Sequence, residues 1–106
     1  MTVSDALRVP MDVLTEFSQR WRATELALFG SALRDDFGPE SDVDVLVSFA
    51  QDAKWSLIDL AEMEEELEGI LGREVDLVER RAVEQSENYI RRRHILSTAE
   101  PIYVVR

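Results

Sequence analysis

The segment from Asp42 to Phe49, Asp-Val-Asp-Val-Leu-Val-Ser-Phe, constrains the fold of this chain more than any other stretch. Its β-branched and apolar residues predict a β-strand. Because successive side chains of a strand point to opposite faces of the sheet, Asp42 and Asp44 share one face and the three valines share the other. The valine face has to be buried by other elements, so we expect a sheet with helices packed on it.

Periodic patterns on both sides of this segment supply those elements. Apolar residues at helical spacing predict three helices, over about 10–22, 54–71 and 80–99. Strand-type runs predict three further strands, over 24–29, 73–79 and 101–105. We also expect a brief helix at Ala32–Arg34 and a loop over Asp35–Ser41, which contains Gly38-Pro39. The predicted order is α-β-β-α-β-α-β, an α/β (α+β) fold with a mixed β-sheet.

The side chains that we expect to face the core follow the same periods. On the first helix they are Val13, Leu14, Phe17 and Trp21. On the second helix they are Leu57, Leu60, Ala61, Leu67, Ile70 and Leu71, and Gly72 fits the position just beyond its C-terminus. On the third helix they are Val83, Ile90 and Leu96.

Length and composition limit the class of protein. A chain of 106 residues is expected to form one domain, over 1–106. The absence of cysteine excludes disulfides and thiolate metal sites. The N-terminal residues do not resemble a signal peptide, and no stretch approaches the roughly 20 apolar residues that cross a bilayer. We therefore expect a cytoplasmic protein with no membrane partner.

The charge pattern limits the partners. A formal net charge of −10 repels phosphate backbones, so DNA and RNA are poor candidates for the main partner. Five glutamates lie within seven residues, from Glu62 to Glu68. This run is interpreted either as a solvated helix face or as a docking surface for a basic partner. The cluster Arg91–Arg93 is ordinary surface charge or a contact for a triphosphate or an acidic partner.

Asp42 and Asp44 form the first candidate for chemistry. Residues two apart in a strand lie about 6.5 Å apart along the chain, so the two carboxylates repel each other unless a cation lies between them. A hard divalent cation bound through oxygen ligands is the usual solution. From these residues alone, the alternative stays open that Asp42 caps the preceding loop and Asp44 faces water.

Asp76 is a third carboxylate in a strand-type run, with Val75 and Leu77 on the opposite face. If this strand pairs beside that of Asp42 and Asp44, three carboxylates converge on one face of the sheet. Such a set can hold two metal ions about 4 Å apart, as phosphoryl chemistry requires. Taken alone, a mid-strand aspartate is more often a surface residue.

Gly30-Ser31 follows one strand-type run and precedes the brief helix. Glycine lets the backbone approach a phosphate closely, serine adds a hydroxyl donor, and N–H groups at a helix start favour anions. A Gly-Ser turn is weak evidence by itself. Neither the P-loop nor the Gly-x-Gly-x-x-Gly pattern occurs in the sequence.

Together, Gly30-Ser31, ten intervening residues, Asp42-Val43-Asp44 and the later Asp76 resemble the signature of the DNA polymerase β-type nucleotidyltransferases. More narrowly, the chain resembles the minimal nucleotidyltransferase (MNT) family of bacteria and archaea. The resemblance covers nearly the whole chain, including Leu-Phe-Gly-Ser at 28–31, Ser-Asp-Val-Asp-Val-Leu-Val at 41–47 and Gly-Arg-Glu-Val-Asp-Leu-Val at 72–78.

The resemblance implies a magnesium-dependent enzyme that transfers a nucleoside monophosphate, AMP from ATP, to a hydroxyl group. Asp42, Asp44 and Asp76 would be both catalytic residues and ligands of two Mg²⁺ ions. Asp76 would also help to deprotonate the acceptor hydroxyl. The implied nucleotide-binding residues are Gly30, Ser31, Arg34 and Ser41.

The same resemblance implies a partner. MNT proteins are often encoded beside a HEPN-domain ribonuclease toxin, which they neutralise, and they can transfer AMP to a tyrosine of that toxin. We therefore expect an antitoxin with a HEPN-type toxin partner, in a homo- or hetero-oligomer.

Two other functions stay open at the level of sequence. One is a binding module that inhibits its partner by contact alone, and the other is an enzyme that acts on a small molecule such as an aminoglycoside. The intact Gly-Ser and three-aspartate set favours an enzyme over a pure binder. The short chain offers few walls for a small-molecule acceptor pocket.

Overall fold

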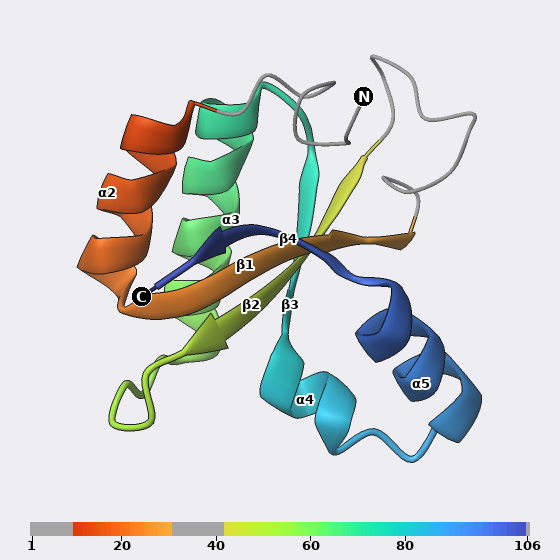
Figure 1. Ribbon diagram of the computed structural model, residues 1–106. Coiled ribbons are helices and arrows are strands. Elements are labelled where there is room, and N and C mark those ends of the chain that lie inside the picture. Colours follow the sequence, from red (N-terminus) through yellow and green to blue (C-terminus); the bar gives the residue numbers. More distant parts are fainter. Residues whose placement is uncertain (1–9, 31–41, 106) are drawn as a thin grey trace.

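The computed structural model describes residues 10–30 and 42–105, and Figure 1 shows their arrangement. At the centre lies a four-stranded mixed sheet in the order β3-β2-β1-β4. β1 (Ala23–Phe29) pairs antiparallel with both β2 (Val43–Phe49) and β4 (Glu100–Val104), whereas β3 (Val75–Glu79) pairs parallel with β2. The fold class and the four strands predicted from the sequence are confirmed. The predicted features at 32–34 and 35–41 lie outside the described residues.

Helices cover both faces of the sheet. α2 (Met11–Trp21) and α3 (Leu57–Leu71) lie side by side on one face, and α4 (Arg80–Glu84) and α5 (Tyr89–Thr98) lie on the other (Figure 1). Each face has its own apolar cluster. The cluster under α2 and α3 contains Leu14, Phe17, Ala23, Leu26, Leu28, Val43, Val45, Val47, Met63, Leu67, Leu71 and Val75. The cluster under α4 and α5 contains Ala27, Phe29, Leu46, Val83 and Ile95.

The alternation predicted for β2 is confirmed. Val43, Val45 and Val47 all lie in the α2–α3 cluster, while Leu46 lies in the cluster on the opposite face. Asp44, two positions before Leu46, therefore belongs to the α4–α5 face.

The helix predicted over 54–71 begins later, at Leu57, because Ser56 caps it. The Ser56 hydroxyl accepts a hydrogen bond from the Asp59 N–H (3.2 Å), and the Asp59 carboxylate accepts one from the Ser56 N–H (2.9 Å). These reciprocal bonds satisfy two donors that the first turn leaves without helical partners. The predicted apolar stripe is wrong at its start, since Leu57 is 84% exposed and Ala61 is also exposed. The buried stripe runs instead through Met63, Leu67 and Leu71.

Two further predictions about helix faces need correction. Val13 is 47% exposed, and α2 buries Leu14 and Phe17 without it. The single helix predicted over 80–99 is two helices, because Asn88 starts a new one by accepting a hydrogen bond from the Arg91 N–H (3.1 Å). The resulting change of direction leaves Ile90 79% exposed and buries Ile95 instead.

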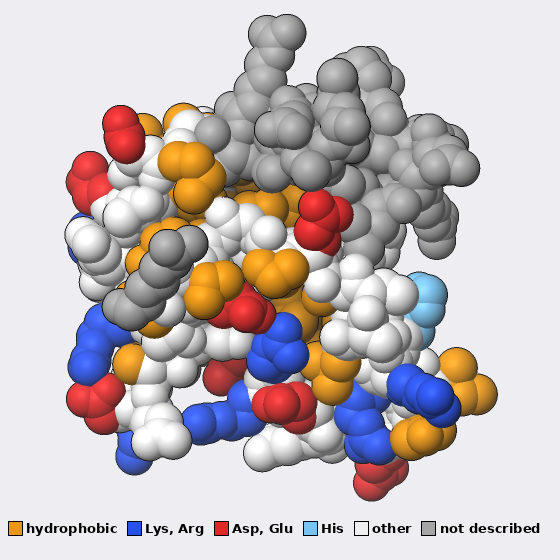
Figure 2. All heavy atoms as spheres, viewed as in Figure 1, with side chains coloured by type: hydrophobic (Ala, Val, Ile, Leu, Met, Phe, Trp, Pro, Cys, Tyr) orange, Lys and Arg blue, Asp and Glu red, His pale blue; other side chains and the backbone are white. Residues whose placement is uncertain are grey.

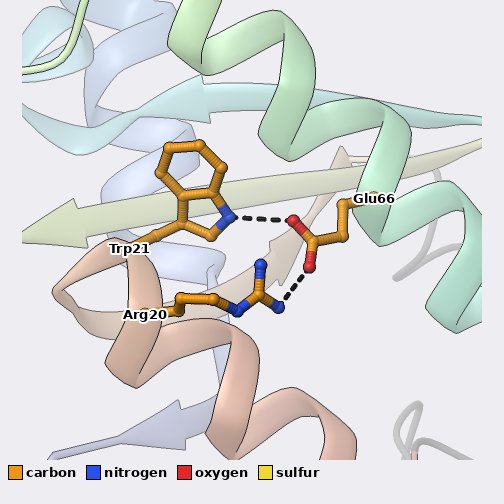
Figure 3. Close-up of polar contacts among 3 residues, drawn as sticks. All are labelled: Arg20, Trp21 and Glu66. Atoms are coloured by element: carbon orange, nitrogen blue, oxygen red, sulfur yellow. Dashed lines mark hydrogen bonds and ion pairs between the residues drawn. The ribbon is translucent and has the colours of Figure 1, made fainter.

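One glutamate of the acidic run joins the two helices of the first face. The Glu66 carboxylate accepts a hydrogen bond from Trp21 Nε1 (2.9 Å) and pairs with the Arg20 guanidinium (Figure 3). The hydrogen bond from Arg20 lowers the pKa of the Glu66 carboxyl below its ordinary value, although partial burial opposes this shift. Trp21 also stacks edge-on against Trp55, with ring centroids 5.2 Å apart.

Two other glutamates of the run bind the backbone of β3. Glu68 Oε2 accepts from the Val75 N–H, and Glu64 Oε2 accepts from the Leu77 N–H, each at 3.0 Å. The run is therefore not one solvated face, since three of its five carboxylates have internal partners. Its exposed members are Glu62 and Glu65. Within the described segments, no helix is long and apolar enough to cross a membrane.

Candidate active site

Asp44 and Asp76 lie side by side on adjacent strands. They are direct register partners in the parallel pair of β2 and β3, where neighbouring strands lie about 4.8 Å apart. Both belong to the α4–α5 face, because Val43, Val45 and Val75 lie in the cluster on the opposite face. Asp44 is half-buried and Asp76 is exposed. The sheet thus brings together two of the three carboxylates that the sequence singles out.

The position of α4 and α5 leaves these carboxylates accessible. The apolar cluster under the two helices reaches Leu46 on β2, and Asp44 is the next residue of the same strand face towards the N-terminal end of β2. In Figure 1 α4 lies at the far end of β3, and α5 lies beside β1 and β4. Phe29 on β1 is buried under these helices, whereas the two aspartates on β2 and β3 stay at least partly exposed.

Gly30 lies directly against Asp44. Phe29, the last residue of β1, is the register partner of Asp44, so the next residue turns at the side of that aspartate. Gly30 has φ +62°, and a Cβ built on it would collide with the Asp44 carboxylate, approaching Cγ to 3.3 Å. Both the left-handed backbone and the close approach therefore require glycine here. The Gly-Ser motif and the Asp-x-Asp motif meet at this contact.

The remaining predicted site residues are placed less fully. Asp42 directly precedes β2 and is exposed, and the adjacent Val43 N–H donates to the Glu74 carbonyl (2.9 Å), which holds this end of β2 beside β3. Ser31, Arg34 and Ser41 lie outside the described residues. In the parts of the chain that are described, no three His, Cys, Asp or Glu side chains form a group that could hold a metal ion.

The chemistry of the adjacent pair nevertheless fits a magnesium site. Carboxylate oxygens are the ligands that hard divalent cations prefer. Gly30 has no side chain where a Cβ would fill the space beside the Asp44 carboxylate. Asp44 and Asp76 are thus two adjacent oxygen donors on one sheet face.

The glutamates that bind β3 were missed by sequence reasoning. The sequence pattern places Glu64 and Glu68 only in the acidic run, but their hydrogen bonds reach the residues on either side of Asp76. The sequence offers one signal for this role: the two glutamates are four residues apart, so they lie on the same face of the helix, shortly before the turn at Gly72.

A separate hollow of about 310 Å³ lies at the other end of β2 and β3. It is lined by Phe49, Ala53, Lys54, Trp55, Glu79 and Arg81, and includes none of the predicted site residues.

Known proteins resemble this chain in sequence. Residues 10–98 match the family described as nucleotidyltransferase domain. Over 63 residues the chain is 43% identical to the protein adenylyltransferase MntA of Thermococcus cleftensis, a match that spans 59% of this chain and 62% of that relative, less than two thirds of its length. Over 81 residues it is 32% identical to MJ1379 of Methanocaldococcus jannaschii, a protein assigned as a protein adenylyltransferase, covering 76% of this chain and 78% of that one.

Solved structures show the same fold. A structure assigned as a minimal nucleotidyltransferase superposes with a TM-score of 0.66 at 30% identity, covering 98% of this chain and 97% of that one. A crystal structure of a toxin–antitoxin with AMP-PNP superposes with a TM-score of 0.67 at 19% identity, covering 92% and 75%. At that identity the second likeness concerns the fold alone. The predicted family is confirmed: this chain belongs to the nucleotidyltransferase domain family and is a homologue of the protein adenylyltransferase MntA.

Proposed function

We propose that this protein is a magnesium-dependent protein adenylyltransferase, which transfers AMP from ATP to a hydroxyl of a partner protein. The observation that carries the proposal is the register pair of Asp44 and Asp76 beside Gly30. Like charges directly opposite on adjacent strands are destabilising. A cation bound between the two carboxylates would offset this repulsion. The adenylyltransferase names of the relatives support the same reaction class.

In this proposal the residues divide the work of nucleotidyl transfer. Gly30, Ser31, Arg34 and Ser41 would hold the triphosphate, and Asp42, Asp44 and Asp76 would hold magnesium. When bound, the metal would supply positive charge to offset that of the phosphate oxygens. Asp76 takes the proton of the acceptor hydroxyl, whose oxygen forms a bond to the α-phosphorus. The bond between the α-phosphorus and the bridging oxygen breaks, and pyrophosphate leaves with that oxygen.

The proposed acceptor is a tyrosine of a HEPN-type toxin, which the protein silences as an antitoxin in the cytoplasm. The net charge of −10 favours a partner with a basic face, because complementary charge speeds encounter and sets orientation. An added AMP places negative phosphate near residues that must bind RNA, and this repels the RNA substrate. The likeness to a toxin–antitoxin fold is consistent with such a pair.

Labelled ATP tests the reaction class. The purified protein is incubated with Mg²⁺ and a HEPN-type toxin, using ATP labelled at the α- or the γ-phosphate in parallel reactions. We expect label in the partner from α-labelled ATP alone. Label from γ-labelled ATP would indicate a kinase instead, and label from neither would leave inhibition by contact as the function.

A further inference from the structure

The edge strand β3 is fastened along its outer side by carboxylates of α3. Among the described strands, β3 pairs with β2 on one side only, since it is the first strand in the sheet order. In a strand, N–H groups point alternately to either side, so those of Val75 and Leu77 point away from β2 and that of Asp76 points towards it. Glu68 accepts from the first outward N–H and Glu64 from the second, both at 3.0 Å.

The two bonds fit together because the helix and the strand have matching spacings. Glu64 and Glu68 are one helical turn apart, which is a rise of about 6 Å. Val75 and Leu77 are two strand positions apart, which is about 6.6 Å. The chain reverses direction between α3 and β3 at Gly72, which has φ +69° and donates its N–H to the Glu68 carbonyl (2.8 Å). Glu68 therefore holds this turn through both its backbone and its side chain.

We propose that Glu64 and Glu68 are positioning residues for Asp76, an inference that rests on the proposed function. They fix the backbone immediately before and after Asp76, and this keeps its carboxylate level with Asp44 on β2. An edge strand without these bonds would present two backbone donors to water and could move relative to β2. A displacement of about 1 Å in a catalytic carboxylate can lower the reaction rate by about 100-fold.

The two residues act through hydrogen bonds rather than through charge. A glutamine at either position keeps a side-chain carbonyl oxygen that can accept the same N–H, whereas an alanine keeps no acceptor. The glutamine variants should therefore keep the hydrogen bonds that the alanine variants lose. Glu62 and Glu65 provide matched controls, because they lie on the same helix and in the same acidic run but are exposed.

The experiment compares Glu64→Ala and Glu68→Ala, singly and together, with both glutamine variants and with Glu62→Ala and Glu65→Ala. AMP transfer is measured as kcat and as KM for ATP, and amide hydrogen exchange at Val75 and Leu77 is followed by NMR. We expect the alanine variants to lower kcat about 10-fold or more, the size typical of lost outer-shell partners, with a smaller change in KM. Exchange at the affected amide rises, and the glutamine variants stay near wild type.

Two outcomes would overturn the proposal. One is kcat in folded Glu64→Ala and Glu68→Ala equal to that of the Glu62 and Glu65 controls. The other is loss of kcat in the glutamine variants as large as in the alanine variants, which would assign the effect to charge. If the double variant fails to fold, the single variants carry the test, since each leaves one of the two bonds in place.

Failure of the proposed function has a different signature. If the wild-type protein transfers no AMP, the exchange rates still report whether each glutamate protects its own amide. Active wild-type protein together with unchanged exchange in the alanine variants would leave the proposed function standing and remove the positioning role.

Discussion

Gly30 combines a left-handed backbone with close approach to the Asp44 carboxylate, so a side chain there has two separate effects. Gly30→Ala is expected to lower the free energy of unfolding by about 1–2 kcal/mol through the backbone alone. It should also displace Asp44 and reduce AMP transfer by about 100-fold, the loss that a misplacement of about 1 Å can cause. Thermal melts and initial rates measure the two effects.

The other described glycines separate these effects. A Cβ at Gly69 meets nothing within 4 Å, and this residue lies within α3, so Gly69→Ala should stabilise the protein by about 0.5–1 kcal/mol. Gly72 has a positive φ but equally open surroundings, so Gly72→Ala should lose stability while keeping most activity. Equal activity in the Gly30 and Gly72 variants would show that the contact with Asp44 has no role in the reaction.

Asp76 is predicted to act in the transition state more than in nucleotide binding. Asp76→Asn should reduce the rate of the chemical step by about 10² to 10⁴, the usual contribution of a general base, and weaken triphosphate binding less. Single-turnover kinetics and calorimetric titration with a non-hydrolysable ATP analogue give the two quantities. Equal losses in both would make Asp76 a plain ligand.

Among the contacts between elements, the one between α2 and α3 through Glu66 should make the free energy of unfolding depend on pH. The pKa of Glu66 in the folded protein lies below its ordinary value, which is about 4.3 in unfolded chains. The stabilisation from Glu66 is therefore complete above about pH 4.3 and is lost as the pH falls through the lower, folded-state pKa. Glu66→Gln should lower the free energy of unfolding by about 1 kcal/mol at pH 7.

Denaturant unfolding at pH 7 and at an acidic pH well below about 4.3 checks this prediction. The difference between wild type and Glu66→Gln should shrink at the lower pH, because the stabilisation is lost as the wild-type carboxyl takes up a proton. Glu65→Gln, on the exposed side of the same helix, is the matched control and should change little at either pH. A Glu66 difference that is the same at both pH values would exclude the ionised contact with Arg20 as its source.

Elements with strong periodicity could be predicted from the sequence, and elements that depend on local capping could not. The alternation in Asp42–Phe49 gave the strand and its two faces, because side-chain direction in a strand depends only on position. The break between α4 and α5 was missed, since helical spacing continues across it and only the Asn88 cap reveals the new start. Leu57 was assigned to the core because a periodic pattern does not show where the sheet beneath the helix ends.

The candidate site shows the same division. The shared face of Asp44 and Asp76 followed from two strand patterns, but their direct pairing depends on the parallel register of β2 and β3, which no local pattern specifies. The roles of Glu64 and Glu68 were hidden for a similar reason. Their carboxylate oxygens accept from backbone N–H groups, and every residue except proline has such a group, so the sequence does not show which ones are bound.

The whole molecule carries a formal net charge of −10, which bears on the proposed protein partner. Its accessible aspartates lie on the α4–α5 face of the sheet. Basic and apolar side chains gather at the start of α5 (Figure 2), where Tyr89 and Ile90 are exposed beside Arg91–Arg93. The proposed function takes the acceptor hydroxyl from a second protein.

Intact-mass spectrometry of a HEPN-type partner shows whether AMP is transferred to it. The partner is incubated with ATP, Mg²⁺ and either wild-type protein or Asp44→Asn, and its ribonuclease activity is assayed in the same samples. We predict a mass increase equal to one AMP and loss of ribonuclease activity with wild type, and neither with the variant. Equal silencing by both proteins without added mass would rule out AMP transfer as the cause and establish inhibition by contact.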